Sequence, residues 1–137
     1  MEPYEYLPHT ADIKFRAQGT TLEEAFLHAA YAFTDIITTH EQIQPSVKKT
    51  FSIQAENNEA LLYDFLEQFI FLLETEGFLL NRISSLIIHD HTLQCTCTGD
   101  THPEQYDIKA HIKAITYQQM SIQQRHNHWQ IEAIVDV

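Results

Sequence analysis

The sequence has 137 residues, of which 44% are hydrophobic, with eight Phe, six Tyr and one Trp. This size and composition are typical of one folded domain and exclude a disordered chain. Eight Lys and Arg against 19 Asp and Glu give a net charge of −11, which disfavours direct nucleic-acid binding and suits a basic protein partner or a hard cation. An acidic surface also simply keeps small proteins soluble, so charge alone does not decide the function.

Two features of the sequence concern its compartment. No apolar run approaches the roughly 20 residues of a membrane span, and the N-terminus MEPYEYLPHT lacks the basic start and apolar stretch of a signal peptide. We therefore expect a cytoplasmic protein without membrane contact. Cys95 and Cys97 are two residues apart in a strand-like stretch, where a disulfide would be strained. We interpret both as packed, free thiols.

A strand and a helix are expected in the first 40 residues. Residues 13–18 alternate apolar and polar side chains, the period of a half-buried strand. Thr20, followed three residues later by Glu23, resembles a capping box at a helix start. Apolar residues at helical spacing then predict an amphipathic helix over 22–37.

A loop, a strand and a longer helix are expected next. We interpret residues 42–49 as a loop and residues 50–55 as a strand. A second helix, capped by Asn57 or Asn58, should run to about Glu76. Its apolar stripe is wide, which predicts deeper burial than for the first helix.

From residue 78 onward the pattern is typical of β structure. Strands are expected over 78–89, 92–98, 109–117 and 129–135. Asp90 and His91 are interpreted as a hairpin turn, and 99–105 as a polar loop. Because helices and strands are intermixed without regular alternation, the sequence predicts an α+β fold. It should be a single domain over residues 1–137, with an antiparallel or mixed β-sheet and two packed α-helices.

The chain contains nine histidines but no common catalytic motif. None lies in an H-E-x-x-H or C-x-x-C context, so scattered surface histidines are favoured over a zinc site. His28 and His40 are placed on or beyond the polar side of the first helix. The chain also has no glycine-rich phosphate loop and no G-x-S-x-G elbow. An ordinary hydrolase or nucleotide-binding enzyme is therefore disfavoured.

Two aspartates define a candidate metal site. Asp12 begins the first predicted strand, and Asp136 ends the last one beside the α-carboxylate of Val137. If these strands are neighbours, three oxygen-bearing groups converge, and Ca²⁺ and Mg²⁺ prefer oxygen ligands. The alternative is a pair of solvated acids near the chain ends.

Two basic residues near these aspartates have both a functional and a plain interpretation. His9 precedes Asp12 by three residues and can orient its carboxylate by hydrogen bonding, or can be an ordinary turn histidine. Lys113 belongs to an alternating segment, and its side chain can simply lie on a solvated strand face.

Three motifs, in the same order over nearly the whole chain, resemble the archease family. They are HTADI followed by GTTLEEAF, then GDTHPEQY leading into IKAITYQQM, and finally a Trp129-containing strand that ends in Asp136-Val137. The resemblance implies a small acidic accessory protein, not an enzyme and without catalytic residues. Its partner would be the GTP-dependent RNA ligase of tRNA splicing and RNA repair. Archeases promote the metal-dependent guanylylation and turnover of that ligase.

The resemblance also implies site residues. The family's calcium-type site corresponds to Asp12, Asp136 and Val137, with Ca²⁺ favoured and Mg²⁺ or Mn²⁺ as alternatives. The family's functional lysine corresponds to Lys113, which would contact the partner or a nucleotide phosphate as a mobile charge. Gln118 stands where many relatives have His, so no histidine can act as a ligand or proton carrier there.

Two other functions remain open. One is a chaperone-like modulator of RNA-modifying enzymes, such as a tRNA methyltransferase. The other is a metal-dependent phosphohydrolase, although the sequence shows no second carboxylate pair or general base.

Overall fold

The computed structural model describes residues 2–9 and 11–137, which form strands, two α-helices and two short 3-10 helices. In chain order the elements are β1 (Tyr4–Leu7), β2 (Ile13–Gly19), α1 (Leu22–Ile37), η1 (His40–Gln42), β3 (Val47–Gln54), α2 (Asn58–Glu76), β4 (Leu79–His89), β5 (Thr92–Asp100), η2 (Pro103–Gln105), β6 (Ala114–Arg125) and β7 (His128–Asp136).

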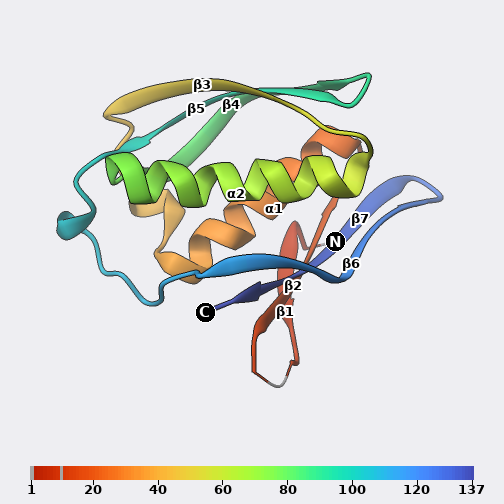
Figure 1. Ribbon diagram of the computed structural model, residues 1–137, viewed down its shortest axis with the longest axis horizontal. Helices are drawn as coiled ribbons and strands as arrows, with labels where there is room; N and C mark the ends of the chain where they lie inside the picture. Colours follow the sequence, from red (N-terminus) through yellow and green to blue (C-terminus); the bar gives the residue numbers. More distant parts are fainter. Residues whose placement is uncertain (1, 10) are drawn as a thin grey trace.

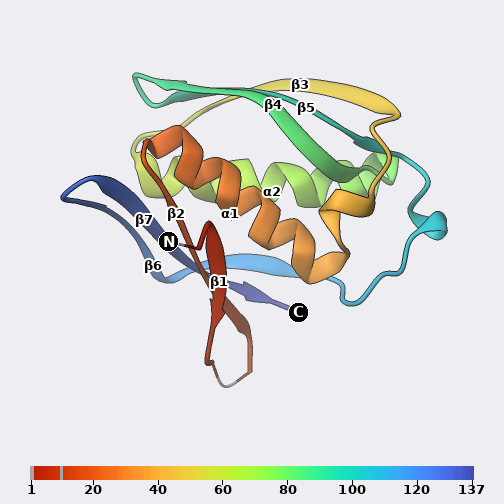
Figure 2. The same ribbon diagram turned by 180° about the vertical axis from the view of Figure 1, so that it is seen from behind.

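The strands form two antiparallel sheets with both helices between them (Figures 1 and 2). Sheet A has the order β1-β2-β7-β6, and sheet B has the order β3-β5-β4. The α+β fold with two packed helices is confirmed, with antiparallel pairing throughout. Among the described residues, neither helix is long and apolar enough to cross a membrane.

The strand expected over 13–18 and the first helix form where the pattern predicts them, as β2 and α1. In β2 the side chains of Phe15 and Ala17 are fully buried. The cap of α1 is Thr21 and not Thr20, because the hydroxyl of Thr21 accepts the N–H of Glu24 at 3.0 Å. The carboxylate of Glu24 in turn accepts the N–H of Thr20 at 2.8 Å. Reciprocal capping therefore occurs, one residue later than predicted.

The second helix has the predicted ends but not the predicted burial. Asn57 caps α2 by accepting the N–H of Ala60, and Gly77 ends it at a φ of 69°. Nine of the 16 residues of α1 are buried, against six of the 19 residues of α2. The prediction of deeper burial for α2 is wrong, because α1 packs against β2 and β7 on one side and β4 on the other. One face of α2 instead remains in solvent, where Phe71 is 54% exposed.

Three predicted boundaries are also wrong. Strand β5 continues to Asp100, so the start of the predicted 99–105 loop belongs to a strand. Strand β3 begins at Val47, so the end of the predicted 42–49 loop belongs to a strand. The last but one strand begins at Ala114, not at residue 109, and continues to Arg125. Residues 109–113 lie outside any strand, and the N–H of Lys109 donates to the carbonyl of Ile37 at 2.7 Å. Local alternation does not reveal which extended segments find a strand partner.

Two predictions about sheet B are confirmed, and one prediction about His40 in η1 is wrong. Asp90 and His91 have φ values of 50° and 59° and form the β4–β5 hairpin turn. Cys95 and Cys97 are buried, free thiols on β5. His40 is only 8% exposed, although a polar position was predicted. Its ring stacks on Tyr31 of α1 with centroids 4.2 Å apart, because η1 follows α1 and packs against α1 and β4.

Candidate functional site

The register of sheet A brings the two predicted metal-binding aspartates to one end of the sheet. The terminal pair of the β2–β7 ladder is Ile13 opposite Val135. Asp12 directly precedes the first of these residues and Asp136 directly follows the second. The two aspartates therefore lie at the same end of sheet A, each one residue beyond the last β2–β7 pair. Asp12 is half-buried and Asp136 is exposed.

Lys113 reaches the same end of sheet A from the neighbouring strand. Its backbone N–H donates to the carbonyl of Asp136 at 2.8 Å, and the next residue, Ala114, pairs with Asp136 in the β6–β7 ladder. The side chain of Lys113 is exposed. Backbone pairing thus joins Lys113 to Asp136, and Asp12 lies at the same end of the sheet beside the last β2–β7 pair.

The residues present fit a hard cation in chemistry, but they supply few side-chain ligands. Residues 2–9 and 11–137 contain no group of three or more His, Cys, Asp or Glu side chains placed to hold a metal. Asp12 and Asp136 contribute two carboxylates, and Val137 would have to contribute a third oxygen ligand. An all-oxygen set of this kind suits Ca²⁺ or Mg²⁺ and not a thiophilic metal.

A cavity of about 460 Å³ adjoins this end of sheet A. It lies between the β1–β2 connection and the C-terminal end of α1, and is lined by Tyr6, Leu7, Pro8, His9, Asp12, Ile13, Asp35, Ile36 and Lys109. Asp136, Val137 and Lys113 are not part of its wall. The cavity therefore places Asp12 and His9 on a common surface, with Lys109 as an additional cation that the sequence did not single out.

His9 is exposed and shares the cavity wall with Asp12. Within the described part of the chain, no hydrogen bond joins the two side chains. An orienting role for His9 therefore stays a prediction. Asp12 directly precedes β2, whose backbone is paired on both sides, with β1 and β7.

A hydrogen-bonded cluster around Asp35, in the wall of the cavity, was not predicted. Asp35 accepts the Tyr4 hydroxyl at 2.5 Å and the His40 N–H at 2.9 Å, and Nδ1 of His40 lies 2.8 Å from the same carboxylate. Burial by itself raises the pKa of Asp35, but the hydrogen bonds from His40 and Tyr4 outweigh it and hold this pKa below its usual value. Tyr4 and Asp35 are 31 residues apart, so no local pattern signals the contact.

A second cluster, the Asp100 clasp (Asp100, Thr101, His102 and Tyr106), forms where β5 ends. Asp100 is 3% exposed and accepts the Tyr106 hydroxyl at 2.5 Å and the Thr101 N–H at 2.8 Å. Nδ1 of His102 lies 3.1 Å from the same carboxylate. These residues are the GDTHPEQY motif. The clasp fixes the start of the segment that leads from sheet B to Lys113.

Comparison with known proteins agrees with this architecture. Residues 4–137 match the archease protein family. Protein archease of Methanosarcina barkeri is 32% identical over 139 residues, with 98% of this chain and 95% of that protein covered. Protein archease of Pyrococcus furiosus is 33% identical over 142 residues, with 100% of both chains covered.

Solved structures show the same fold. The solution structure of Methanobacterium thermoautotrophicum protein 1598 superposes with a TM-score of 0.83 at 27% identity, over 100% of both chains. The crystal structure of a Thermotoga maritima archease, described as a possible chaperone, has a TM-score of 0.65 at 20% identity, over 96% of this chain and 94% of that one. By its match over nearly its whole length, the chain belongs to the archease family.

Proposed function

We propose that this protein is a non-enzymatic activator of the GTP-dependent RNA ligase of tRNA splicing and RNA repair. It would act through a divalent cation held by Asp12, Asp136 and the Val137 carboxylate. The observation that supports the proposal is the β2–β7 register, whose terminal pair of Ile13 and Val135 has Asp12 and Asp136 as chain neighbours, in a chain of the archease family. The acidic surface, with a net charge of −11, supports a protein partner over direct RNA binding.

A divalent cation at this position, Ca²⁺ foremost with Mg²⁺ or Mn²⁺ as alternatives, would supply positive charge beside nucleotide phosphates at the partner's catalytic centre. The role of Asp12 and Asp136 is to hold it on paired backbone at the end of sheet A. Both residues belong to or adjoin ladder positions, so their Cα atoms are fixed while their carboxylates remain accessible.

Lys113 would contribute the second positive charge. Its backbone is tied to Asp136, while its ammonium group is on a flexible four-carbon stem in solvent. This arrangement supports a contact with a phosphate or an acidic group of the ligase. Gln118, which is exposed in the irregular part of β6, cannot carry a proton there.

The proposal is tested by following guanylylation of the purified ligase. The protein with GTP alone should consume no GTP, whereas its addition to ligase, GTP and a divalent cation should increase the guanylylated fraction. Stimulation that persists undiminished after chelation and metal-free repurification would contradict the cation role. GTP hydrolysis without ligase would instead indicate the phosphohydrolase.

The contribution of Val137 has its own test. A short extension after Val137 converts its carboxylate into a neutral peptide carbonyl, and hard cations bind more weakly as ligand charge falls. Calorimetry with Ca²⁺ and Mg²⁺ should show weaker binding to the C-terminally extended protein than to an N-terminally extended control. Equal affinities would leave only Asp12 and Asp136 as ligands.

One comparison favours a second candidate function. The Thermotoga maritima archease is described as a possible chaperone, which supports a chaperone-like modulator of RNA-modifying enzymes. Parallel pull-downs with the ligase and with a tRNA methyltransferase distinguish the two. Retention of the methyltransferase alone would favour the modulator, and retention of the ligase alone would favour the activator.

A further inference from the structure

The solvent face of α2 carries exposed aromatic side chains. Phe71 of α2 and Tyr117 of β6 are each 54% exposed, and they are two of the four large hydrophobic residues exposed in the described part of the chain. The ring of Tyr117 is stacked on Tyr63 of α2, with centroids 4.5 Å apart and planes 9° apart. An aromatic pair held in this way is a rigid contact surface that loses little conformational freedom on binding.

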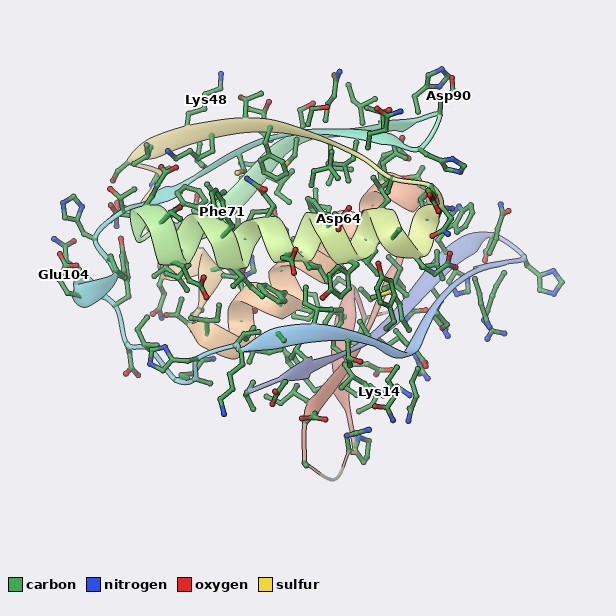
Figure 3. The ribbon with its side chains drawn as sticks, viewed as in Figure 1. Lys14, Lys48, Asp64, Phe71, Asp90 and Glu104 are labelled. Atoms are coloured by element: carbon green, nitrogen blue, oxygen red, sulfur yellow. The ribbon has the colours of Figure 1, made fainter. Side chains whose placement is uncertain are left out.

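Helical spacing joins these rings into one stripe. Tyr63, Glu67 and Phe71 follow each other at intervals of four residues, so they lie on the same side of α2. Asp64 lies beside them, and Figure 3 shows Asp64 and Phe71 along the same exposed helix. A hollow of about 320 Å³ lies along the stripe, lined by Ile53, Asp64, Glu67, Gln68 and Phe71.

Tyr117 lies where the pairing of β6 is irregular. Between Thr116 and Ser121 the β6–β7 register shifts, and Gln119 has a φ of 58°. Tyr117 lies at the start of this irregular segment. Tyr117 therefore has no β7 partner in the ladder, and its ring packs on Tyr63 of α2.

The charge of the stripe is uniformly negative. Helix α2 contains no Lys, Arg or His, and its acidic residues are Glu59, Asp64, Glu67, Glu74 and Glu76. Among the ion pairs formed by residues 2–9 and 11–137, none includes Asp64 or Glu67. Burial first, and then the charges of Asp64 and Glu67, raise the pKa of Tyr117. The carboxylates beside the rings therefore attract cations to this surface.

We propose that the α2 face, formed by Tyr63, Asp64, Glu67, Phe71 and Tyr117, docks a basic segment of a protein partner that carries arginine and an aliphatic side chain. A guanidinium group can stack on the Tyr117 ring while it pairs with a carboxylate, and Phe71 with the adjoining hollow accepts an aliphatic group. This surface is separate from the proposed cation site, and the inference does not depend on the ligase.

Charge decides between possible occupants. Nucleic acid would bring phosphates against Asp64 and Glu67, which repel them. A second copy of the chain in a twofold dimer would place the same acidic patch against itself, and like charges across an interface are unfavourable. A basic protein segment is the occupant that both the carboxylates and the rings accept.

The test compares two double variants with the same change in net charge. The probe is a fluorescein-labelled peptide of repeated Arg-Leu-Ser units, with a Lys-Leu-Ser peptide of equal charge alongside. D64N/E67Q neutralises the α2 face, and D90N/E104Q neutralises two exposed acids at other parts of the molecule (Figure 3). We expect D64N/E67Q to weaken binding of the Arg peptide about fivefold or more, and D90N/E104Q to weaken it less than about twofold. Salt screens distant charges, so mainly the carboxylates near the contact affect the affinity.

Three further measurements complete the test. The wild-type protein should bind the Arg peptide about threefold more tightly than the Lys peptide, since only guanidinium stacks well. Phe71→Ser should weaken binding of the Arg peptide without lowering the melting temperature, because the ring is already 54% exposed. Amide NMR shifts on titration should centre on residues 60–71 and 116–119.

Specific outcomes would overturn the inference. Equal weakening in both double variants would mean general charge attraction, and shifts centred on another face would mean another site. Absence of saturable binding would also count against it. Self-association that Phe71→Ser abolishes would identify a second copy as the occupant, and tighter binding of an RNA oligonucleotide than of the Arg peptide would exclude a protein segment.

Discussion

Strands β5 and β7 both end in an aspartate, and the two carboxylates have opposite surroundings. Asp100 is 3% exposed, and its oxygens accept hydrogen bonds from Tyr106 and Thr101 with His102 alongside. Asp136 is exposed, and within the described residues its carboxylate has no hydrogen-bond or ion-pair partner. The same residue type at the same place in a strand thus has two different environments.

The two carboxylates therefore differ in how readily each can bind a ligand. The oxygens of Asp100 already accept several hydrogen bonds, so a ligand would have to displace these bonds at a carboxylate that is only 3% exposed. The carboxylate of Asp136 is exposed and Asp12 is half-buried in a cavity wall, and within the described residues neither carboxylate has a hydrogen bond that a cation would displace. We therefore expect substitutions at Asp100 to affect stability, and substitutions at Asp12 and Asp136 to affect function.

The largest expected effect is a loss of stimulation of ligase guanylylation in the variants Asp12→Asn and Asp136→Asn. Each removes one charge from a set of few ligands, so cation affinity and stimulation should fall about tenfold or more. The unfolding free energy should stay within about 0.5 kcal/mol of wild type, since within the described residues neither carboxylate makes a hydrogen bond or ion pair that the amide would lose. Guanylylation assays and denaturant unfolding on the same samples measure both quantities.

Asp100→Asn is the reciprocal control for that experiment. It should lower the melting temperature while the stimulation per folded molecule stays near wild type. If Asp136→Asn proved to be the destabilising variant, or if Asp100→Asn abolished stimulation in fully folded protein, the division between the two aspartates would be wrong.

A smaller effect is expected from Tyr106→Phe, which tests the Asp100 clasp without changing charge. The hydroxyl donates to Asp100 and accepts the N–H of Gln44 at 3.1 Å. Loss of such hydrogen bonds costs about 1 kcal/mol of unfolding free energy, a factor of about five in the ratio of folded to unfolded protein. Urea unfolding provides the measurement. An unchanged transition midpoint would show that the clasp does not stabilise the fold.

The smallest expected effect is a pH dependence of the unfolding free energy that arises from Asp100. Hydrogen bonds from Tyr106 and His102 hold the pKa of Asp100 below its usual value. Since the folded-state pKa is depressed, the stabilisation is present above the unfolded pKa of about 3.9 and is lost as the pH falls through the folded value. Below about pH 4, wild-type stability should therefore fall more steeply than that of Asp100→Asn.

His102 has the opposite dependence. Its hydrogen bond with Asp100 raises its pKa above 6.5, so this stabilisation is present below pH 6.5 and is lost as the pH rises through the raised value. The difference in unfolding free energy between wild type and Asp100→Asn should be greatest between about pH 4 and pH 6.5. A difference that is constant from pH 3 to pH 8 would contradict both linkages.

Much of the candidate site was predictable because its residues lie in recognisable motifs. Asp12 lies in HTADI, Asp136 ends the chain's last strand, and Lys113 lies in IKAITY. Lys109 and the Asp35–His40–Tyr4 cluster were not predictable, since neither belongs to a motif and both acquire their position from contacts with distant segments. The same holds for the stacking of Tyr117 on Tyr63 across 54 positions.

The sequence by itself determined where the helices and most strands form, because capping residues and apolar periodicity act between near neighbours in the chain. Only the tertiary structure decided which segments meet. It paired β2 with β7, left residues 109–113 without a ladder, buried α1 more than α2, and exposed the acidic aromatic face of α2. These outcomes depend on how two sheets enclose two helices, and the same local pattern is compatible with more than one such packing.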